Sequence, residues 1–331
     1  MQDKRYDLKI IVRIKDDITY NNQEIIQIEK EKYDLSKDKP DVIFYMNGTI
    51  SGPNELEEIN KYSKLVINIP YVYYLLDKES YTYISNNVKY LSMEESCFNP
   101  VNSLNLGHPA LDGIYQKFQE EENIPKEWKE KIKKRKVFLW NAVHGYEESL
   151  FKGTTFHNVF NYIIDYFSNK EDIALIFRPH PLIFKELINN SIVTREDIDE
   201  FKKYCNESSN IILDETLECF NAFQVSDALI SDLSGLMFSY LFTNKPVLYL
   251  NRKNVELNEN MNKLYYLANI DEDVMSDAFD EIDKFIKNVC NNRDILKNER
   301  LKEKSVFDKY FDGNTGVRIK KYIDKFIEEN Q

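Results

Sequence analysis

The sequence predicts an α/β protein with parallel sheets, organised in two domains. Short apolar runs alternate along the chain with segments of helical periodicity, which is the pattern of parallel sheets covered by helices. The 331 residues are enough for two domains of ordinary size. The best candidate for the boundary is the charged stretch from Glu120 to Lys136, which ends in KEWKEKIKKRK. We therefore expect an N-terminal domain over residues 1–125 and a C-terminal domain over residues 126–331.

Each expected element rests on one apolar run or one helical period. In the first domain we expect strands at Leu8–Ile14, Asp41–Tyr45, Lys64–Ile69, Val88–Met93 and Leu104–Leu106, and helices at Leu56–Tyr62 and from Pro109 to about Glu121. In the second we expect strands at Val137–Trp140, Ile173–Phe177, Ile211–Leu213, Ala228–Ile230 and Val247–Leu250, and helices at His157–Phe167, Leu182–Asn189 and Thr194–Cys205. From Glu272 onward the chain is charged and helical, with an interruption at Asp312–Asn314.

The composition excludes several classes of protein. A net charge of −12 argues against general nucleic-acid binding. The four cysteines are spaced too widely for a zinc knuckle or a disulfide framework, so we expect reduced thiols and a cytoplasmic protein. We expect no signal peptide after MQDKRYDLKII, and no apolar run approaches the roughly 18 residues of a membrane span. The basic cluster of residues 126–136 could contact the inner membrane face peripherally, or it is a solvated helix.

One stretch, Ser226–Arg252, predicts a strand, a tight polar turn, a helix and a second strand. Ser234 is a good helix N-cap, and a small polar turn after a buried strand can hold an anion. Alternatively, the stretch is an ordinary βαβ unit. A second signal is RPHP, which follows the apolar run Ile173–Phe177. Because ligands bind outside the carboxyl ends of parallel strands, Arg178 and His180 should share one sheet edge with the turn; the alternative is a structural loop histidine.

Five motifs in this order resemble the CDP-glycerol glycerophosphotransferase family, which makes teichoic-acid and capsule polymers. They are GHPALD (Gly107–Asp112), KVFLWNAVH (Lys136–His144), RPHP (Arg178–Pro181), SDLSG (Ser231–Gly235) with the KPV strand after it, and FDGNTGVRI (Phe311–Ile319). The resemblance covers roughly Leu104 to Ile319, and the first hundred residues only loosely. It implies a GT-B fold, in which two Rossmann-like domains face a cleft and C-terminal helices cross back to the first domain.

The resemblance implies a transferase that moves a polyol phosphate, such as glycerol phosphate, from a CDP-linked donor. The acceptor is a hydroxyl of a polymer or lipid-linked molecule, and CMP is released. It implies a catalytic role for His180, donor phosphate binding by Arg178, Ser231, Asp232, Ser234 and Gly235, and a nucleotide lining of Asn141, Asp214 and Thr216. Positions at strand ends and loops add His144 as a second catalytic candidate and Tyr71, Tyr73 and His108 as an acceptor side. Simpler roles are turn stabilisation for Asp232, loop capping for His108 and packing for the tyrosines. No metal site or cofactor is expected, although Mg²⁺ carried loosely by the diphosphate stays open.

The chain departs from the family pattern at three places. Gly235 stands where a second serine is common, and Ser239 where an acidic residue is common. A His-Gly assigned as the acceptor-side base has no counterpart in NIPYVYY (Asn68–Tyr74). Tyrosine titrates near pH 10 and is a poor base, so deprotonation is late and weak, or His144 is the base. Two other functions stay open: a GT-B glycosyltransferase that uses a nucleotide sugar, and a non-catalytic nucleotide-binding subunit.

Overall fold

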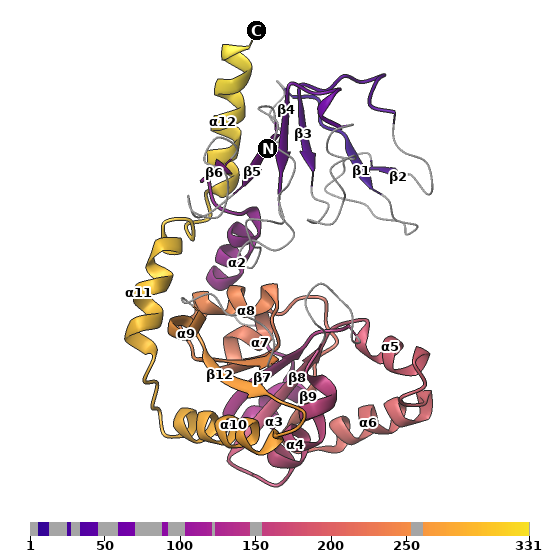
Figure 1. Ribbon diagram of the computed structural model, residues 1–331, viewed down its shortest axis with the longest axis vertical. Helices are drawn as coiled ribbons and strands as arrows, with labels where there is room; N and C mark the ends of the chain where they lie inside the picture. Colours follow the sequence, from indigo (N-terminus) through magenta and orange to yellow (C-terminus); the bar gives the residue numbers. More distant parts are fainter. Residues whose placement is uncertain are drawn as a thin grey trace.

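The described residues form three parallel sheets with helices around them (Figure 1). This computed structural model describes residues 6–12, 25–27, 34–45, 59–69, 88–91, 103–120, 123–145, 154–252 and 261–330. The strands are β1 (Ile10–Val12), β2 (Ile25–Gln27), β3 (Val42–Tyr45), β4 (Leu65–Asn68), β5 (Val88–Leu91), β6 (Ser103–Leu104), β7 (Lys136–Ala142), β8 (Ile173–Pro179), β9 (Ile211–Leu213), β10 (Ala228–Ser231), β11 (Val247–Arg252) and β12 (Tyr266–Ile270). The sheet orders are β1-β2, β3-β4-β5-β6 and β12-β11-β10-β7-β8-β9.

Helices precede and follow the strands as a parallel sheet requires. They are α2 (Pro109–Gln119), α3 (Lys126–Ile132), α4 (Phe156–Ser168), α5 (Ile183–Asn189), α6 (Arg195–Glu207), α7 (Phe220–Val225), α8 (Gly235–Tyr240), the 3₁₀ helix η2 (Leu241–Thr243), α9 (Met261–Leu264), α10 (Met275–Cys290), α11 (Lys297–Asp308) and α12 (Thr315–Glu329). The expected α/β class is confirmed. Strand β12 and helix α9 were not expected from the sequence, and neither was β2.

The six-stranded sheet is apolar on both faces because helices cover both. Along β7, Phe138 and Trp140 face one core, which contains α4 and α10, and Val137 and Leu139 face the other. Trp140 is fully buried and stacks on Phe177, with ring centroids 4.5 Å apart. Truncating a buried aromatic side chain of this size costs about 3–5 kcal/mol, so Trp140→Ala should unfold much of this domain. The core therefore fixes the strand ends that carry the polar motifs.

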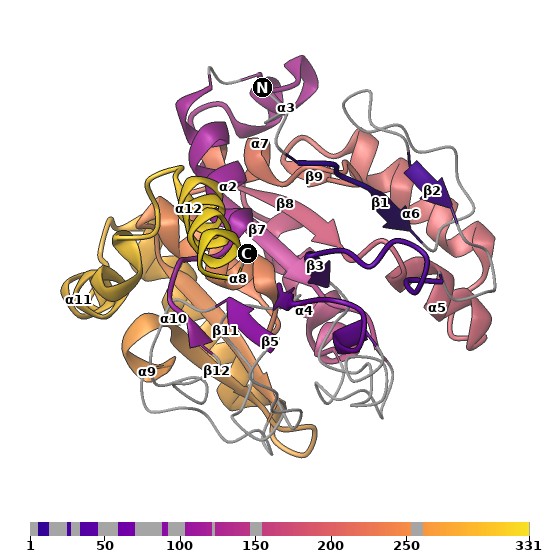
Figure 2. The same cartoon turned by 90° about the horizontal axis from the view of Figure 1, so that it is seen from above.

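Helix α12 crosses back from the six-stranded sheet to the four-stranded one, as expected (Figure 1). Its spacing of apolar residues buries Ile319 and Ile323 against Leu65 and Ile67 of β4. Helices α10 and α11 lead the chain from the larger sheet to this position, and Figure 2 shows α12 end-on beside α2. The C-terminal segment therefore completes the N-terminal core.

Two motifs far apart in the sequence meet where the chain crosses between the sheets. The carboxylate of Asp112 accepts hydrogen bonds from the backbone N–H groups of Thr315 (2.9 Å) and Gly316 (2.8 Å), at the start of α12. Arg318 donates to the carbonyl of Leu106 (2.8 Å). Gly107 has φ +93°, and a Cβ there would lie 2.9 Å from the Thr315 hydroxyl, so glycine is required for conformation and for space. GHPALD and FDGNTG thus form one clasp.

Packing assigns α2 to the larger sheet. Its buried residues Leu111 and Ile114 belong to the core beneath β7, together with Trp128 of α3. The expected domain boundary at residues 125/126 falls between α2 and α3, whose buried residues share this one core. The position of the domain boundary therefore stays a prediction. Tyr71 and Tyr73 lie outside the described residues.

Candidate functional site

The predicted polar motifs lie at one edge of the six-stranded sheet. Strand β7 is central, with β10 on one side and β8 on the other, and all are parallel, so their carboxyl ends are neighbours. The register pairs Arg178 with Asn141, Asn141 with Ser231, and Ser231 with Tyr249. Residues paired across neighbouring strands lie on the same face of a sheet. The sequence prediction that RPHP and SDLSG share an edge is therefore correct.

Asn141, Ser231 and Ser234 form a hydrogen-bonded cluster at this edge. The Ser234 hydroxyl donates to Asn141 Oδ1 (3.1 Å) and accepts from the backbone N–H of Met237 (3.2 Å), which makes Ser234 the N-cap of α8, as expected. Ser231 lies within 3.2 Å of Ser234, oxygen to oxygen, and Asn141 Nδ2 donates to the carbonyl of Arg178 (3.1 Å). Gly235 follows, and no atom lies within 4 Å of the position a Cβ would take. The cluster is thus ordered and opens onto free space.

Asp232 stabilises the turn in place of the phosphate-binding role expected for it. Its carboxylate is 2 % exposed and accepts from Val143 N–H (3.0 Å), the Thr154 hydroxyl (2.9 Å), and the N–H and hydroxyl of Thr155. Burial raises the pKa of Asp232, against the hydrogen bonds from Thr155, Val143 and Thr154 that lower it. All four partners occupy the carboxylate, so it ties the end of β10 to the end of β7 and the start of α4. This corrects its assignment as a donor-binding residue.

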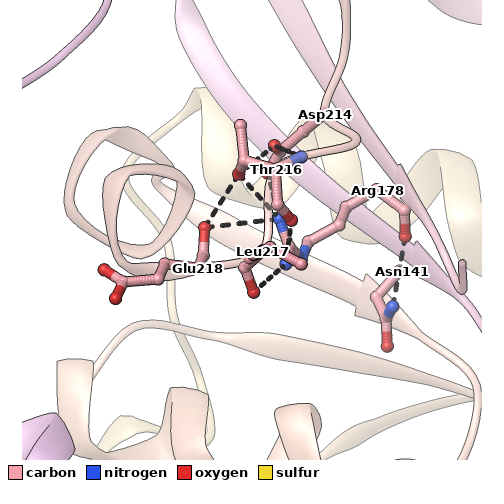
Figure 3. Close-up of polar contacts among 6 residues, drawn as sticks. All are labelled: Asn141, Arg178, Asp214, Thr216, Leu217 and Glu218. Carbon is pink, nitrogen blue, oxygen red and sulfur yellow. Dashed lines mark hydrogen bonds and ion pairs between the residues drawn. The ribbon is translucent and has the colours of Figure 1, made fainter. Parts of the chain in front are cut away.

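Arg178 uses its guanidinium to hold the loop after β9, where the prediction gave it a phosphate (Figure 3). Nη1 donates to Asp214 Oδ2 (2.6 Å), and Nη2 donates to the carbonyls of Thr216 (2.8 Å) and Leu217 (3.2 Å). The Asp214 side chain is 0 % exposed and also accepts from the N–H and hydroxyl of Thr216. Arg178, Asp214 and Thr216 are therefore brought together as predicted, but as one folded loop. At its tip, Leu217 is 99 % exposed.

His144 and His180 lie side by side at the ends of β7 and β8, with ring centroids 4.0 Å apart. His144 Nδ1 lies 2.9 Å from Glu186 Oε1, and the N–H of Gly145 donates to Glu186 Oε2 (3.0 Å). His180 Nδ1 accepts from the N–H of Leu182 (3.1 Å). Burial lowers the pKa of His180, His144 lowers it further, and Glu186 acts in the opposite direction. Burial thus favours the neutral form of the His180 imidazole at pH 7.

Glu186 contacts the histidine pair, and the sequence did not single it out. It lies six residues after His180 in the helix that follows RPHP, and this proximity was the available signal. His108, which was predicted on the acceptor side, is 8 % exposed and accepts from the N–H of Ala110 (3.2 Å) as the N-cap of α2. The capping role weighed for His108 is therefore the one observed.

Three broader features concern metal ions, membrane spans and thiols. Among the described residues, no group of three or more His, Cys, Asp and Glu side chains is placed to hold a metal ion. No helix in that part of the chain is long and apolar enough to cross a membrane. Within the same residues, Cys205, Cys219 and Cys290 are free, and burial raises the pKa of Cys205 to about 12 and of Cys219 to about 11. These thiols are poor nucleophiles.

Similar solved structures have the same architecture. The S. aureus MnaA–UDP structure has a TM-score of 0.58 at 16% identity, covering 92% of this chain and 84% of that one. A UDP-GlcNAc 2-epimerase from Methanocaldococcus jannaschii scores 0.56 at 15% identity, covering 92% and 86%. A variant of the wall teichoic acid polymerase TagF scores 0.51 at 14% identity, covering 98% and 82%. These likenesses show the fold, which is of the GT-B type.

The sequence itself decides the family. A search of curated proteins gave no match. The family model for CDP-Glycerol:Poly(glycerophosphate) glycerophosphotransferase matches residues 65–325, which include the six-stranded sheet, strands β4 to β6 of the four-stranded sheet, the clasp and the polar edge. With that match over most of its length, the chain belongs to the CDP-Glycerol:Poly(glycerophosphate) glycerophosphotransferase family of enzymes.

Proposed function

We propose that this protein transfers glycerol phosphate from CDP-glycerol to a hydroxyl of a growing polymer or lipid-linked acceptor and releases CMP. The observation that carries the proposal is the polar edge of the six-stranded sheet. Within a family that uses this donor, the edge gathers hydroxyl and imidazole groups from three neighbouring strand ends. Ligands of open α/β sheets bind at this kind of edge.

The donor is proposed to lie with its diphosphate near Ser234, Gly235 and His180. The Nε2–H of His180 donates to the diphosphate, and the hydroxyl of Ser234 does so by turning its proton away from Asn141 Oδ1. The free space beside Gly235 leaves room for phosphate oxygens close to the backbone. The nucleoside is proposed to lie toward the Asp214–Glu218 loop, because the hydrogen bonds of Arg178 hold that loop at the end of the neighbouring strand β9.

The reaction is a displacement at the phosphorus that carries glycerol. The acceptor oxygen bonds to this phosphorus, the bond to the bridging oxygen breaks, and CMP leaves with that electron pair. The acceptor proton passes to a base, and from there to solvent. Positioning and neutralisation of charge supply most of the catalysis in such transfers. His180, held neutral by burial, is proposed to stabilise the leaving phosphate by a hydrogen bond.

Contact with the inner membrane face is the second part of the proposal. Lys126, Lys129, Lys133 and Lys134 on and after α3 are exposed, and a lipid-linked acceptor would be found at that surface. Exposed Glu127 and Glu130 dilute the patch. Sedimentation with anionic vesicles should therefore show weak binding that 0.5 M salt abolishes, and equal binding to neutral vesicles would contradict an electrostatic contact.

Release of CMP is the direct test. The protein is incubated with CDP-glycerol and a lipid-linked glycerol phosphate primer, with and without Mg²⁺, and CMP is quantified by chromatography. Primer-dependent CMP release with product growth in steps of one glycerol phosphate is expected. UDP-GlcNAc is the control donor, and Ser234→Tyr is the control variant because its ring would block the turn. Consumption of UDP-GlcNAc in place of CDP-glycerol would favour a glycosyltransferase, and binding of CDP without turnover would favour a silent subunit.

A further inference from the structure

The two adjacent histidines have their Nδ1 atoms bound to partners of opposite kind. Glu186, on α5, presents a carboxylate oxygen 2.9 Å from His144 Nδ1. Leu182, at the start of α5, presents a backbone N–H 3.1 Å from His180 Nδ1. An ionised carboxylate can only accept a hydrogen bond, and a backbone N–H can only donate one. Each partner therefore selects one tautomer of its neutral imidazole.

The selected tautomers are opposite. His144 must carry its proton on Nδ1 to donate to Glu186, which leaves a free lone pair on Nε2. His180 must leave Nδ1 unprotonated to accept from Leu182, which places its proton on Nε2. The ring centroids are 4.0 Å apart, so one base nitrogen and one N–H belong to the same small region of the sheet edge. In a phosphoryl transfer the entering oxygen loses its proton and the leaving oxygen gains negative charge, so a base serves the first and a hydrogen-bond donor serves the second.

We propose that Glu186 is a positioning residue that fixes His144 as the general base by holding its proton on Nδ1. This inference rests on the proposed function for the reaction in which the base acts. Nε2 of His144 takes the proton of the acceptor hydroxyl as its oxygen bonds to phosphorus, while Nε2–H of His180 donates a hydrogen bond to the departing CMP phosphate. The positive charge that forms on His144 is balanced by the Glu186 carboxylate, and the proton later passes to solvent.

The backbone around Glu186 makes its amide analogue a sharp probe. Oε2 of Glu186 accepts from the N–H of Gly145 (3.0 Å), and Gly145 has φ +121°, a conformation that favours glycine. In Glu186→Gln the amide oxygen must face this N–H, because the amide nitrogen cannot accept from it. The NH₂ group then faces His144 Nδ1 and donates to it. The proton of His144 is thereby moved to Nε2, and the base is lost with little change of shape.

Nuclear magnetic resonance can read the tautomers directly. The sequence has four histidines, so long-range ¹H–¹⁵N spectra of ¹⁵N-histidine protein at pH 8 are simple, and His144→Gln and His180→Gln assign two of them. We expect His144 in the Nδ1–H form and His180 in the Nε2–H form. Glu186→Gln should convert His144 to Nε2–H, and Glu200→Gln, an exposed glutamate on α6, should leave it unchanged. An Nε2–H tautomer of His144 in the unmodified protein, or no change in Glu186→Gln, would overturn the proposal.

Kinetics supply the second arm. Loss of a general base costs about 100- to 10,000-fold in rate, so Glu186→Gln should lower kcat by that order with the KM for CDP-glycerol nearly unchanged. In the His144→Gln background, Glu186→Gln should have almost no further effect, because the two residues act as one unit. Additive losses would assign Glu186 another role. If the unmodified protein does not transfer glycerol phosphate from CDP-glycerol, the proposed function fails. The tautomer measurement still decides the role of Glu186 in that case.

Discussion

Arg178→Ala should act first on the stability of the C-terminal domain, and only through it on donor binding. The mutation leaves the Asp214 carboxylate, whose side chain is 0 % exposed, without its cationic partner. Removing one partner of a buried ion pair costs about 3–5 kcal/mol. The hydrogen bonds from Thr216 to Asp214 remain, which favours the lower end of this range. At about 2–4 °C per kcal/mol for 150–250 residues, Tm should fall by roughly 6–20 °C.

The assay is urea unfolding and thermal melting of a double-mutant cycle. Asp214→Ala removes the other partner. The side chain of Arg178 is 13 % exposed, and that of Asp214 is 0 % exposed, so water can solvate the unpaired arginine better and the loss of stability should be smaller. Arg178→Ala together with Asp214→Ala should be less destabilised than the sum of the single variants. CDP-glycerol should still bind to Arg178→Ala at a temperature where it is folded, with an affinity reduced by the looser loop. Full stability combined with loss of binding would refute the reasoning and return Arg178 to the role of a phosphate ligand.

Three further outcomes are expected. Gly235→Ser should fold with unchanged stability, within about 0.5 kcal/mol, because a Cβ there meets no atom within 4 Å; a more than tenfold rise in the KM for CDP-glycerol would show that the donor occupies that space. Burial and His144 lower the pKa of His180, so its contribution to stability is present above about pH 6.5 and is lost as the pH falls. The difference between the free energies of unfolding in urea at pH 7 and at pH 5.5 should therefore be smaller in His180→Gln than in the unmodified protein. An unchanged difference would contradict the lowered pKa. Asp112→Ala should cost about 0.5–2 kcal/mol by uncapping α12 and should increase proteolysis of the C-terminal helix, and equal proteolysis would contradict the clasp.

The strand ends could be predicted from the sequence because apolar runs and polar turns are local signals. The run before RPHP and the run before SDLSG placed Arg178 and Ser231 near the ends of parallel strands, and the register then joined them through Asn141. Ser234 as an N-cap followed from the same local pattern. What these signals specify is the position of a residue along its strand.

The direction of a side chain could not be predicted, because it depends on residues distant in the sequence. Arg178 turns toward Asp214, which is 36 residues away and directly follows the neighbouring strand β9. Asp232, directly after β10, accepts hydrogen bonds from Thr154 and Thr155 just before α4. These threonines belong to the segment between β7 and α4, 78 and 77 residues earlier in the sequence. Strand β12 was missed for the same reason, since this five-residue edge strand forms only by pairing with β11.

The central claim is that the carboxyl edge of the six-stranded sheet binds CDP-glycerol, and calorimetric titration tests it most directly. CDP-glycerol is titrated into the unmodified protein and into Ser234→Tyr, with UDP-GlcNAc as the competing ligand and thermal melting as the check on folding. The account predicts saturable binding of CDP-glycerol by the unmodified protein, at least tenfold weaker binding by a folded Ser234→Tyr, and little binding of UDP-GlcNAc. Equal affinity of both proteins for CDP-glycerol, or tighter binding of UDP-GlcNAc, would contradict it.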